Sequence, residues 1–594
     1  MAGEARAGSD VPLLSNAELA RIFHQIGDML EVQGELVFKT VAYHRAADAI
    51  AHSPVEVARA YREGHPPRIP GVGAAISKKL EELATTGRLA YYERLREEVP
   101  PSLVELLEIP GVGPRTVKLL YEQRGIETLD DLRRAAEAGH LRDLRGMSER
   151  TEAAILDGIA QLQRRQQRMR LGEAERFVGR IVAALQDTPG LRSLVPAGSF
   201  RRRQETIGDL DLLASTDDPG ALVDRFVGLP SVERVIGAGL HKASVRLRDG
   251  PQVDLMVMPP GAEGTYLVHF TGSKAHNVRL RSRARDRGWS LSEKGYLRLG
   301  PDGEPVEGAG AELRTFATEE ETYAFLDLPW IPPELREDRG EIEAAGRDAL
   351  PTLIERGDLK GDLHVHTNAS DGLDTLERMV AAAQAQNLSY IAITDHAKHL
   401  GIVHGLDAQR LAIQAEAIEA LNERLRGFRI LKGAEVDILE DGRLALPDAV
   451  LERLDVVVVA VHDHFGLSEA RQTSRLLRAL ERPFVSILAH PSGRLIGERE
   501  PYAFDFDKVL DAVSERGGCL EVNGQPTRLD LDDGHIKAAV ERGVLLSVAS
   551  DAHSADELVN LDGAVRQARR GWARPRDVLN TRTHAGVRAL LRKR

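Results

Sequence analysis

Histidine and acidic side chains recur at or just after the ends of short apolar runs in the chain from residue 358 onward. Seven such runs lie between residues 362 and 553, and amphipathic stretches such as 375–386 and 406–425 separate them. Alternating strand and helix patterns predict a parallel barrel, in which the carboxyl ends of the strands meet at one face. Imidazoles and carboxylates converging there predict a multi-metal site able to cleave a phosphoester. The candidate ligands are His364, His366, Asp371, His396, Glu435, His462, His490, Asp551 and His553.

Three aspartates form a second candidate metal site earlier in the chain. Asp209 and Asp211 are two residues apart in an apolar segment, so in a strand both carboxylates face one side. Asp254 lies in a second short strand-like segment, 252–257, and would face the same way if the strands are neighbours. Alternating acids are common on solvent-facing strands, but here a Gly-Ser-x-Arg segment, 198–201, precedes them. Three converging carboxylates predict a site for two divalent cations.

Two similar glycine-containing segments, 68–73 and 108–113, are each followed by a helical stretch. A single copy is as easily an ordinary helix turn. Two copies, with a degenerate third at 144–148, favour turns that bring backbone N–H groups against a phosphate at a helix N-terminus. The expected DNA-backbone contacts are Gly71, Gly73, Gly111 and Gly113.

Composition indicates a multidomain protein of 594 residues with an ordinary globular balance. The single cysteine, Cys519, rules out an intrachain disulfide and fits a reducing compartment. No apolar run approaches membrane-spanning length, so we expect a cytoplasmic protein with no membrane partner. The formal charge is −12, yet basic clusters at 161–170, 201–203 and 274–298 provide surfaces suited to nucleic acid.

The C-terminal pattern resembles the polymerase and histidinol phosphatase (PHP) superfamily. The resemblance rests on His364-Val-His366, Ser370-Asp-Gly372, Thr394-Asp-His396, Glu435, His462, Ala489-His-Pro491 and Ser550-Asp-Ala-His553. It implies three ions: one on His364, His366, Glu435 and Asp551, a second on Glu435, His462 and His490, and a third on Asp371, His396 and His553.

The middle of the chain resembles the nucleotidyltransferase superfamily, and His269-Phe-Thr-Gly-Ser273 with Asn277-x-x-x-Arg281 resembles DNA polymerase family X. A family X polymerase fused to a PHP domain matches bacterial members of that family. The resemblance implies that Asp209, Asp211 and Asp254 are catalytic. It places Arg168, Ser199, Arg202 and Gly208 on the triphosphate, His269, Phe270 and Gly272 at the sugar, Lys274 and Asn277 on the nucleotide, and Arg281 at the template strand.

Three positions depart from the family pattern. His269 stands where a tyrosine is expected and Gln252 where an arginine is expected, which affects insertion rate and sugar selection rather than the metal ligands. Lys79 falls at the position of a Schiff-base lysine that removes an abasic sugar, but the companion lysine position holds Ala75. Lyase activity at Lys79 is therefore left open.

We expect a multidomain fold with helical hairpin-bearing domains, an α+β nucleotidyltransferase palm and thumb, and a distorted (β/α)7 PHP barrel. The predicted domains are 1–95 (first helix-hairpin-helix), 96–165 (fingers with the second), 166–258 (palm), 259–330 (thumb), 331–357 (a linker kept solvated by its charges) and 358–594 (PHP).

The predicted function is short-gap filling in DNA repair, including base excision repair, coupled to a metal-dependent 3′–5′ exonuclease. The expected cofactors are Mg²⁺ or Mn²⁺ at the polymerase site and up to three Mn²⁺ or Zn²⁺ ions in the barrel. The expected partners of the monomer are dNTPs and gapped or nicked DNA with a 5′ phosphate. Two alternatives remain: the barrel hydrolyses a small phosphomonoester or pyrophosphate, or the chain is a DNA-end-binding scaffold with weak catalysis.

Overall fold

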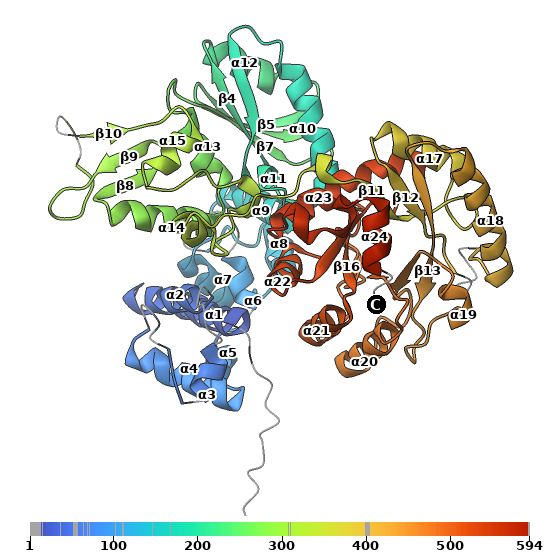
Figure 1. Ribbon diagram of the computed structural model, residues 1–594. Coiled ribbons are helices and arrows are strands. Elements are labelled where there is room, and N and C mark those ends of the chain that lie inside the picture. Colours follow the sequence, from blue (N-terminus) through green and yellow to red (C-terminus); the bar gives the residue numbers. More distant parts are fainter. Residues whose placement is uncertain are drawn as a thin grey trace, which may run out of the picture. The chain divides into compact units, whose positions relative to one another are not determined.

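The computed structural model divides the chain into two compact units, Met1–Arg168 and Met169–Arg594 (Figure 1). Each unit is described by itself. The described residues are 14–591 except 15, 36, 52–56, 63, 68, 70–71, 101, 108, 110–111, 145, 167, 307, 309–310 and 398–403. None of the helices in this described part is long and apolar enough to cross a bilayer.

The N-terminal unit is helical. Its helices are α1 (Asn16–Gln33), α2 (Val37–Ala51), α3 (Val57–Arg62), α4 (Ala74–Thr86), α5 (Ala90–Glu98), α6 (Ser102–Leu106), α7 (Pro114–Arg124), α8 (Leu129–Glu137) and α9 (Glu149–Gln166). Buried side chains from Leu19 to Ile159 form one apolar cluster. The predicted domain boundary at residue 95 falls inside α5, and both halves contribute to this shared core.

A five-stranded sheet lies within residues 166–258, the predicted palm. Its order is β2 (Leu191–Pro196), β4 (Leu210–Thr216), β7 (Gln252–Val257), β6 (Lys242–Leu247) and β5 (Val232–Gly239), and only β4 and β7 run parallel. Helices α10 (Leu171–Leu185) and α12 (Pro219–Val227) share the core of this sheet. The short elements β1 (Met169–Arg170), α11 (Gly198–Arg201) and β3 (Thr206–Ile207) complete it. The apolar side chains of α10 recur every three or four residues, which gives the helix one buried face.

The predicted thumb follows with α13 (Glu263–Thr271), α14 (Lys274–Arg285), β8 (Trp289–Ser292), β9 (Gly295–Arg298), β10 (Leu313–Arg314) and α15 (Glu319–Ala324). The segment 331–357 continues its core with η2 (Pro333–Leu335) and α16 (Glu341–Ala345), and η3 (Arg356–Asp358) follows without a buried side chain. The expectation that charges keep this segment solvated is wrong. Arg336 and Glu341 are fully buried because each is paired, Arg336 with Glu319 and Glu341 with His276 at 2.6 Å.

Seven parallel strands in chain order form the C-terminal barrel, as predicted (Figure 1). They are β11 (Gly361–Val365), β12 (Tyr390–Ile393), β13 (Arg429–Asp437), β14 (Val456–Ala460), β15 (Ile487–Leu488), β16 (Cys519–Asn523) and β17 (Leu545–Ala549). A parallel bridge between Val365 and Ala552 brings the last strand beside the first. Runs of apolar residues fit strands that are covered on both faces.

Helical segments surround the strands (Figure 1). They are α17 (Leu376–Ala385), α18 (Ala408–Arg424), α19 (Asp448–Leu451), α20 (Glu469–Leu480), α21 (Phe506–Arg516), α22 (Asp533–Glu541), η4 (Ala555–Val559), α23 (Asn560–Arg570), η5 (Pro575–Asp577), η6 (Leu579–Thr581) and α24 (His584–Leu591). The main barrel core includes buried residues from α17, α18, α20, α21, α22 and α23 together with alternate strand residues.

Two candidate active sites

The three palm aspartates meet where β4 and β7 run side by side. Asp211 and Asp254 are direct partners in the parallel register, and Asp209 lies just before β4. Gly198 approaches Asp211 so closely that an added Cβ would collide with its carboxylate. Burial, followed by repulsion from Asp209 and Asp254, raises the pKa of Asp211 to about 7. A cluster of this charge is suited to divalent cations, and the ligand roles remain predictions.

Two neighbours orient Asp254. The Gln252 side-chain amide donates a 2.9 Å hydrogen bond to Oδ1, and the Lys242 Nζ lies 3.3 Å from Oδ2. Gln252 therefore holds the carboxylate from the position where the family pattern has an arginine. Sequence reasoning did not identify Lys242, because its position beside Asp254 depends on β6 pairing with β7.

The predicted triphosphate arginine is held in a defined place. Arg202, at the C-terminal end of α11, donates through Nε to Glu337 at 2.8 Å and through Nη1 to the Thr271 carbonyl at 2.8 Å. Ser199 lies on the same short helix. This network places the segment after β2 against the segment that carries His269 to Gly272.

The predicted sugar and base residues lie on α13 and at its junction with α14. Phe270 packs against the palm residues Ala197 and Leu213. Asn277 donates a 2.6 Å hydrogen bond to the His269 carbonyl, and a Cβ on Gly272 would lie 2.8 Å from the Asn277 Oδ1. Burial, followed by repulsion from Arg281, lowers the pKa of His269 and so favours the neutral ring. Of the other predicted contacts, Lys274 and Arg281 are exposed on α14, and Gly208 precedes Asp209. Arg168 is the last residue of the N-terminal unit.

A barrel arginine reaches the same network. Arg570, at the end of α23, donates to the Arg202 carbonyl at 2.8 Å and to Glu337 at 3.3 Å. Its side chain is 2% exposed and also pairs with Asp533. The barrel therefore contributes a buried cation that holds the segment carrying the predicted triphosphate ligand. No pattern in the sequence indicated this residue.

All nine predicted barrel ligands lie in one cluster at the carboxyl ends of the strands, in which Asp371 and His553 are the most exposed, at 27% and 28%. Glu435, in β13, is at its centre. Its Oε2 lies 3.3 Å from His364 Nε2 and 3.0 Å from His396 Nδ1. Its Oε1 lies 3.0 Å from His490 Nε2 and 3.3 Å from His462 Nε2. With His366 Nε2 at 3.6 Å from Oε2, one carboxylate faces five imidazoles, the arrangement expected of a ligand that bridges ions.

The other two carboxylates extend the cluster. Asp551 Oδ1 lies 3.2 Å from His366 Nε2, and Asp371 Oδ2 lies 3.5 Å from the Nε2 atoms of both His396 and His553. Three overlapping sets have ligand atoms within 4.8 Å of one another: His364–His366–Asp551, His366–Asp371–His396–His553 and His396–Glu435–His462. These sets resemble the predicted three-ion arrangement, although their grouping differs, and which residue holds which ion remains a prediction.

The electrostatics favour an ionised carboxylate at the centre. Burial acts to raise the pKa of Glu435, but the imidazoles of His396, His364 and His462 hold it well below its usual value. Glu435 is therefore anionic over the whole neutral pH range, as a candidate metal ligand must be.

The strand β16 supports the cluster instead of supplying one of the nine predicted ligands. Glu521 is fully buried, and its Oε1 lies 2.6 Å from His364 Nδ1 while its Oε2 accepts the His490 backbone N–H at 2.6 Å. Asn523, the last residue of β16, donates to Oε2 of Glu521 and to Asp551. Carboxylates that hold the outer nitrogen of a metal-binding histidine fix its tautomer and orientation. Sequence reasoning missed Glu521, although a lone acid inside a buried strand was the available signal.

Asp437 orients another candidate ligand, His462, in the same way. Its Oδ1 lies 2.6 Å from His462 Nδ1, so the Nε2 of that ring faces Glu435. Asp437 follows Glu435 by two residues in β13, and the period of a strand puts both side chains on one face.

The hairpin segments are described in part. Gly73 and Gly113 are the N-caps of α4 and α7, and a Cβ added at either would meet nothing within 4 Å. Open space in front of a helix N-terminus suits an approaching phosphate. Gly71 and Gly111 lie outside the described residues. Lys79 lies on α4 with its Nζ 4.6 Å from the centre of the Tyr91 ring.

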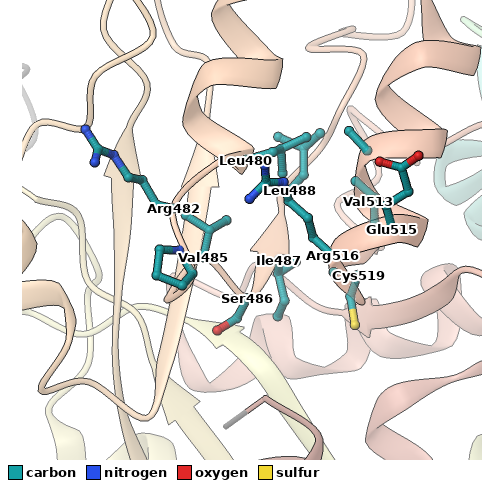
Figure 2. A pocket seen from close by; sticks show the side chains of 13 residues that line it. Leu480, Arg482, Val485, Ser486, Ile487, Leu488, Val513, Glu515, Arg516 and Cys519 are labelled. Carbon is teal, nitrogen blue, oxygen red and sulfur yellow. The ribbon is translucent and has the colours of Figure 1, made fainter. Parts of the chain in front are cut away.

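A cavity of about 300 Å³ lies at the start of β15 and β16, between α20 and α21 (Figure 2). The candidate ligands follow the carboxyl ends of these strands, so the cavity is at the opposite end of the barrel. Its lining includes Arg482, Ser486, Glu515, Arg516 and Cys519 and none of the nine candidate ligands.

Comparison with known families matches four parts of the chain. Residues 14–89 match a helix-hairpin-helix domain and 103–161 a SAM-like helix-hairpin-helix tandem. Residues 266–337 match the DNA polymerase beta thumb and 362–525 the PHP domain.

Some individual proteins match nearly the whole chain and others match only part of it. The DNA polymerase/3′-5′ exonuclease PolX of Bacillus subtilis is 36% identical over 97% of this chain and 99% of its own length. The DNA polymerase lambda of Arabidopsis thaliana is 25% identical over 54% of this chain and 62% of its own length. A probable phosphatase of Caldanaerobacter subterraneus is 33% identical over 34% of this chain and 80% of its own length. With similarity to a family X protein over nearly its whole length and the match to a PHP domain, the chain belongs to the family X DNA polymerases that carry a C-terminal PHP domain.

Proposed function

We propose that this protein is a DNA-directed DNA polymerase that fills short gaps in DNA repair and carries a 3′–5′ exonuclease in its barrel. The observation that carries the proposal is the presence of two separate clusters suited to metal ions in one chain. One is the aspartate group on β4 and β7, and the other is the nine-residue group around Glu435. The similarity to the Bacillus protein, whose name includes both activities, supports this pairing.

At the polymerase site, Asp209, Asp211 and Asp254 would hold Mg²⁺ or Mn²⁺. Such ions activate the attacking 3′ hydroxyl and steady the leaving pyrophosphate. Gln252 and Lys242 keep Asp254 oriented toward the other carboxylates. Arg202, whose Nε and Nη1 donate to Glu337 and to the Thr271 carbonyl, would contact the triphosphate through its remaining N–H groups.

At the barrel site, the nine ligands would hold up to three Mn²⁺ or Zn²⁺ ions. Ions held by imidazoles and carboxylates supply a hydroxide at neutral pH and stabilise both oxygens of the displaced phosphoester. Glu435 stays anionic and faces several imidazoles at once, which suits it to bridge two ions. Glu521 and Asp437 set which nitrogen of His364 and His462 faces the ions.

The substrates of this proposal are dNTPs and gapped or nicked DNA, with the hairpins at Gly73 and Gly113 binding the DNA backbone. We propose that a 5′ phosphate strengthens this binding and that the protein acts as a monomer. The N-termini of α4 and α7 support backbone contact because both are open to solvent and capped by glycine.

A primer-extension and degradation assay on gapped DNA tests both sites together. We expect Asp254→Asn to stop nucleotide addition while primer degradation under Mn²⁺ continues, and Glu435→Gln to do the reverse. Glu515→Gln, an exposed residue of α21 at the end of the barrel opposite the candidate ligands, is the control and should change neither activity. Extension by Asp254→Asn at the wild-type rate would exclude the three-carboxylate site.

A second candidate for the barrel is hydrolysis of a small phosphomonoester. It is supported by the similarity of this third of the chain to proteins named as probable phosphatases. Comparing a 3′-recessed primer with p-nitrophenyl phosphate under Mn²⁺ decides between the two. Rapid release of nitrophenol with no loss of primer would replace the exonuclease with a phosphatase.

A further inference from the structure

Four titratable side chains gather on the first two helices, away from both candidate active sites. His24, Asp28 and Glu31 lie on α1 at intervals of four and three residues, which puts them on one helical face. His44 lies on α2, which packs against that face. One possible ligand atom from each of Asp28, Glu31 and His44 lies within 4.8 Å of the other two.

A glycine inside α1 makes room for the His44 ring. A Cβ at Gly27 would lie 2.6 Å from Cε1 and 2.7 Å from Nε2 of His44. Glycine in a helix interior is unfavourable relative to alanine. At Gly27 the absence of a side chain lets the His44 imidazole lie directly on the α1 backbone. This close approach is independent of the clustering of acids and places His44 between His24 and Asp28.

The two histidines are arranged as a metal ligand and its orienting partner. The Nδ1 atoms of His24 and His44 are 3.2 Å apart, and the ring centres are 5.5 Å apart. When His44 donates its Nδ1 proton to His24, its Nε2 lone pair is left on the side of Asp28. Metal-binding histidines are generally oriented in this way, through a hydrogen bond from the nitrogen that does not touch the ion.

The spacing of the other ligand pair fits an ion better than a direct hydrogen bond. His44 Nε2 and Asp28 Oδ1 are 3.7 Å apart, which is too long for a hydrogen bond. Two ligands at about 2.0–2.2 Å from one ion are separated by roughly 3–3.7 Å. The His44 and Asp28 side chains are 29% and 30% exposed, and Glu31 is exposed, so an ion can enter from solvent.

We propose that Asp28, Glu31 and the Nε2 of His44 bind one divalent transition-metal ion, with His24 as the positioning residue and Gly27 providing the space. Two carboxylates and an imidazole suit Zn²⁺ or Mn²⁺. Such an ion links α1 to α2 in the N-terminal helical unit. The site lies outside the palm aspartates and outside the barrel cluster.

The test uses the full-length protein with Zn²⁺ as the probe. Metal equivalents are counted after dialysis, and hydrogen exchange is followed in peptides from α1 and α2. We expect His44→Phe, which keeps an aromatic ring over Gly27, to lose one equivalent of Zn²⁺ and the Zn²⁺-dependent protection. At a free Zn²⁺ concentration ten times the Kd, exchange that requires separation of the two helices should slow about tenfold in the wild type. Glu105→Gln, in the same unit, is the control.

Gly27→Ala separates a metal site from a purely structural histidine. Alanine favours the helix, yet its methyl group displaces the His44 ring, so we expect weaker Zn²⁺ binding without loss of α1. The proposal fails if wild type and His44→Phe bind equal amounts of Zn²⁺. It also fails if protection of α1 and α2 in the wild type is unchanged by Zn²⁺, because an ion that links the two helices must slow their separation.

Discussion

Replacing Glu521 with glutamine should weaken the barrel metal centre without removing any of its predicted ligands. Glu521 accepts on both oxygens: Oε1 from His364 Nδ1, and Oε2 from the His490 backbone and Asn523. A glutamine offers one acceptor and one donor in the same space. Whichever way the amide turns, either His364 Nδ1 or the His490 backbone N–H faces an NH2 group instead of the oxygen that now accepts its hydrogen bond.

Both orientations of the amide weaken the binding of metal ions by the barrel cluster. If the amide nitrogen faces His364, that ring must accept on Nδ1 and carry its proton on Nε2, the atom that faces Glu435. If the amide nitrogen faces His490 instead, a buried backbone N–H loses its acceptor, at a cost of about 1–3 kcal/mol. Changes to such outer residues typically weaken metal binding about 10- to 100-fold. That range corresponds to roughly 1.4–2.8 kcal/mol.

The assay follows primer degradation by full-length protein across a Mn²⁺ titration, together with the Mn²⁺-induced increase in Tm. We expect the midpoint of both curves to shift about 10- to 100-fold in Glu521→Gln, while gap filling by the palm is unchanged at saturating Mg²⁺. Glu515→Gln, the same substitution on α21 at the other end of the barrel, is the matched control. A folded Glu521→Gln protein with a wild-type Mn²⁺ midpoint would refute the positioning argument.

Three further predictions concern other residues. Arg570→Met should raise KM for dNTP about tenfold or more, because it removes hydrogen bonds from a charged group. Arg570→Lys should restore part of the loss. Steady-state kinetics on gapped DNA measure this KM, and an unchanged value would rule out a link between the barrel and the nucleotide site. Arg336→Met should lower the free energy of unfolding by about 3–5 kcal/mol, because Glu319 loses one of its buried partners. Urea titration measures this free energy. A change below about 1 kcal/mol would count against a structural role for segment 331–357. Lys79→Ala should abolish borohydride trapping on an incised abasic site if this lysine forms the Schiff base, and trapping at the wild-type level would exclude it.

The sequence was sufficient for the elements that repeat and for identifying the candidate ligands that the fold brings together. The barrel was predictable because each strand is a short apolar run and each helix an amphipathic stretch, and the residues after the runs have metal-binding chemistry. The direct pairing of Asp211 with Asp254 agrees with the expectation that their strands are neighbours. Each of these features depends on spacing within a few residues.

The segment 331–357 shows where local patterns mislead. Clustered prolines and charges are typical of a solvated linker. Here Arg336 and Glu341 find buried partners in Glu319 and His276, which lie 17 and 65 residues away in the chain. A charge is predicted to be exposed when its partner cannot be identified, and these partners become visible only in the folded thumb.

The supporting residues of both sites share this property. Glu521 is 157 residues from His364, and Arg570 is 368 residues from the Arg202 carbonyl that it holds. A metal ligand is recognisable because its side chain must have a particular chemistry at a particular strand end. A residue that orients the ligand can come from any neighbouring element, and its identity is constrained only by the geometry of the contact. The residues that tune affinity and position are therefore the part of these sites for which the three-dimensional structure was needed, and Glu521 and Arg570 are where substitutions best separate orientation from ligand chemistry.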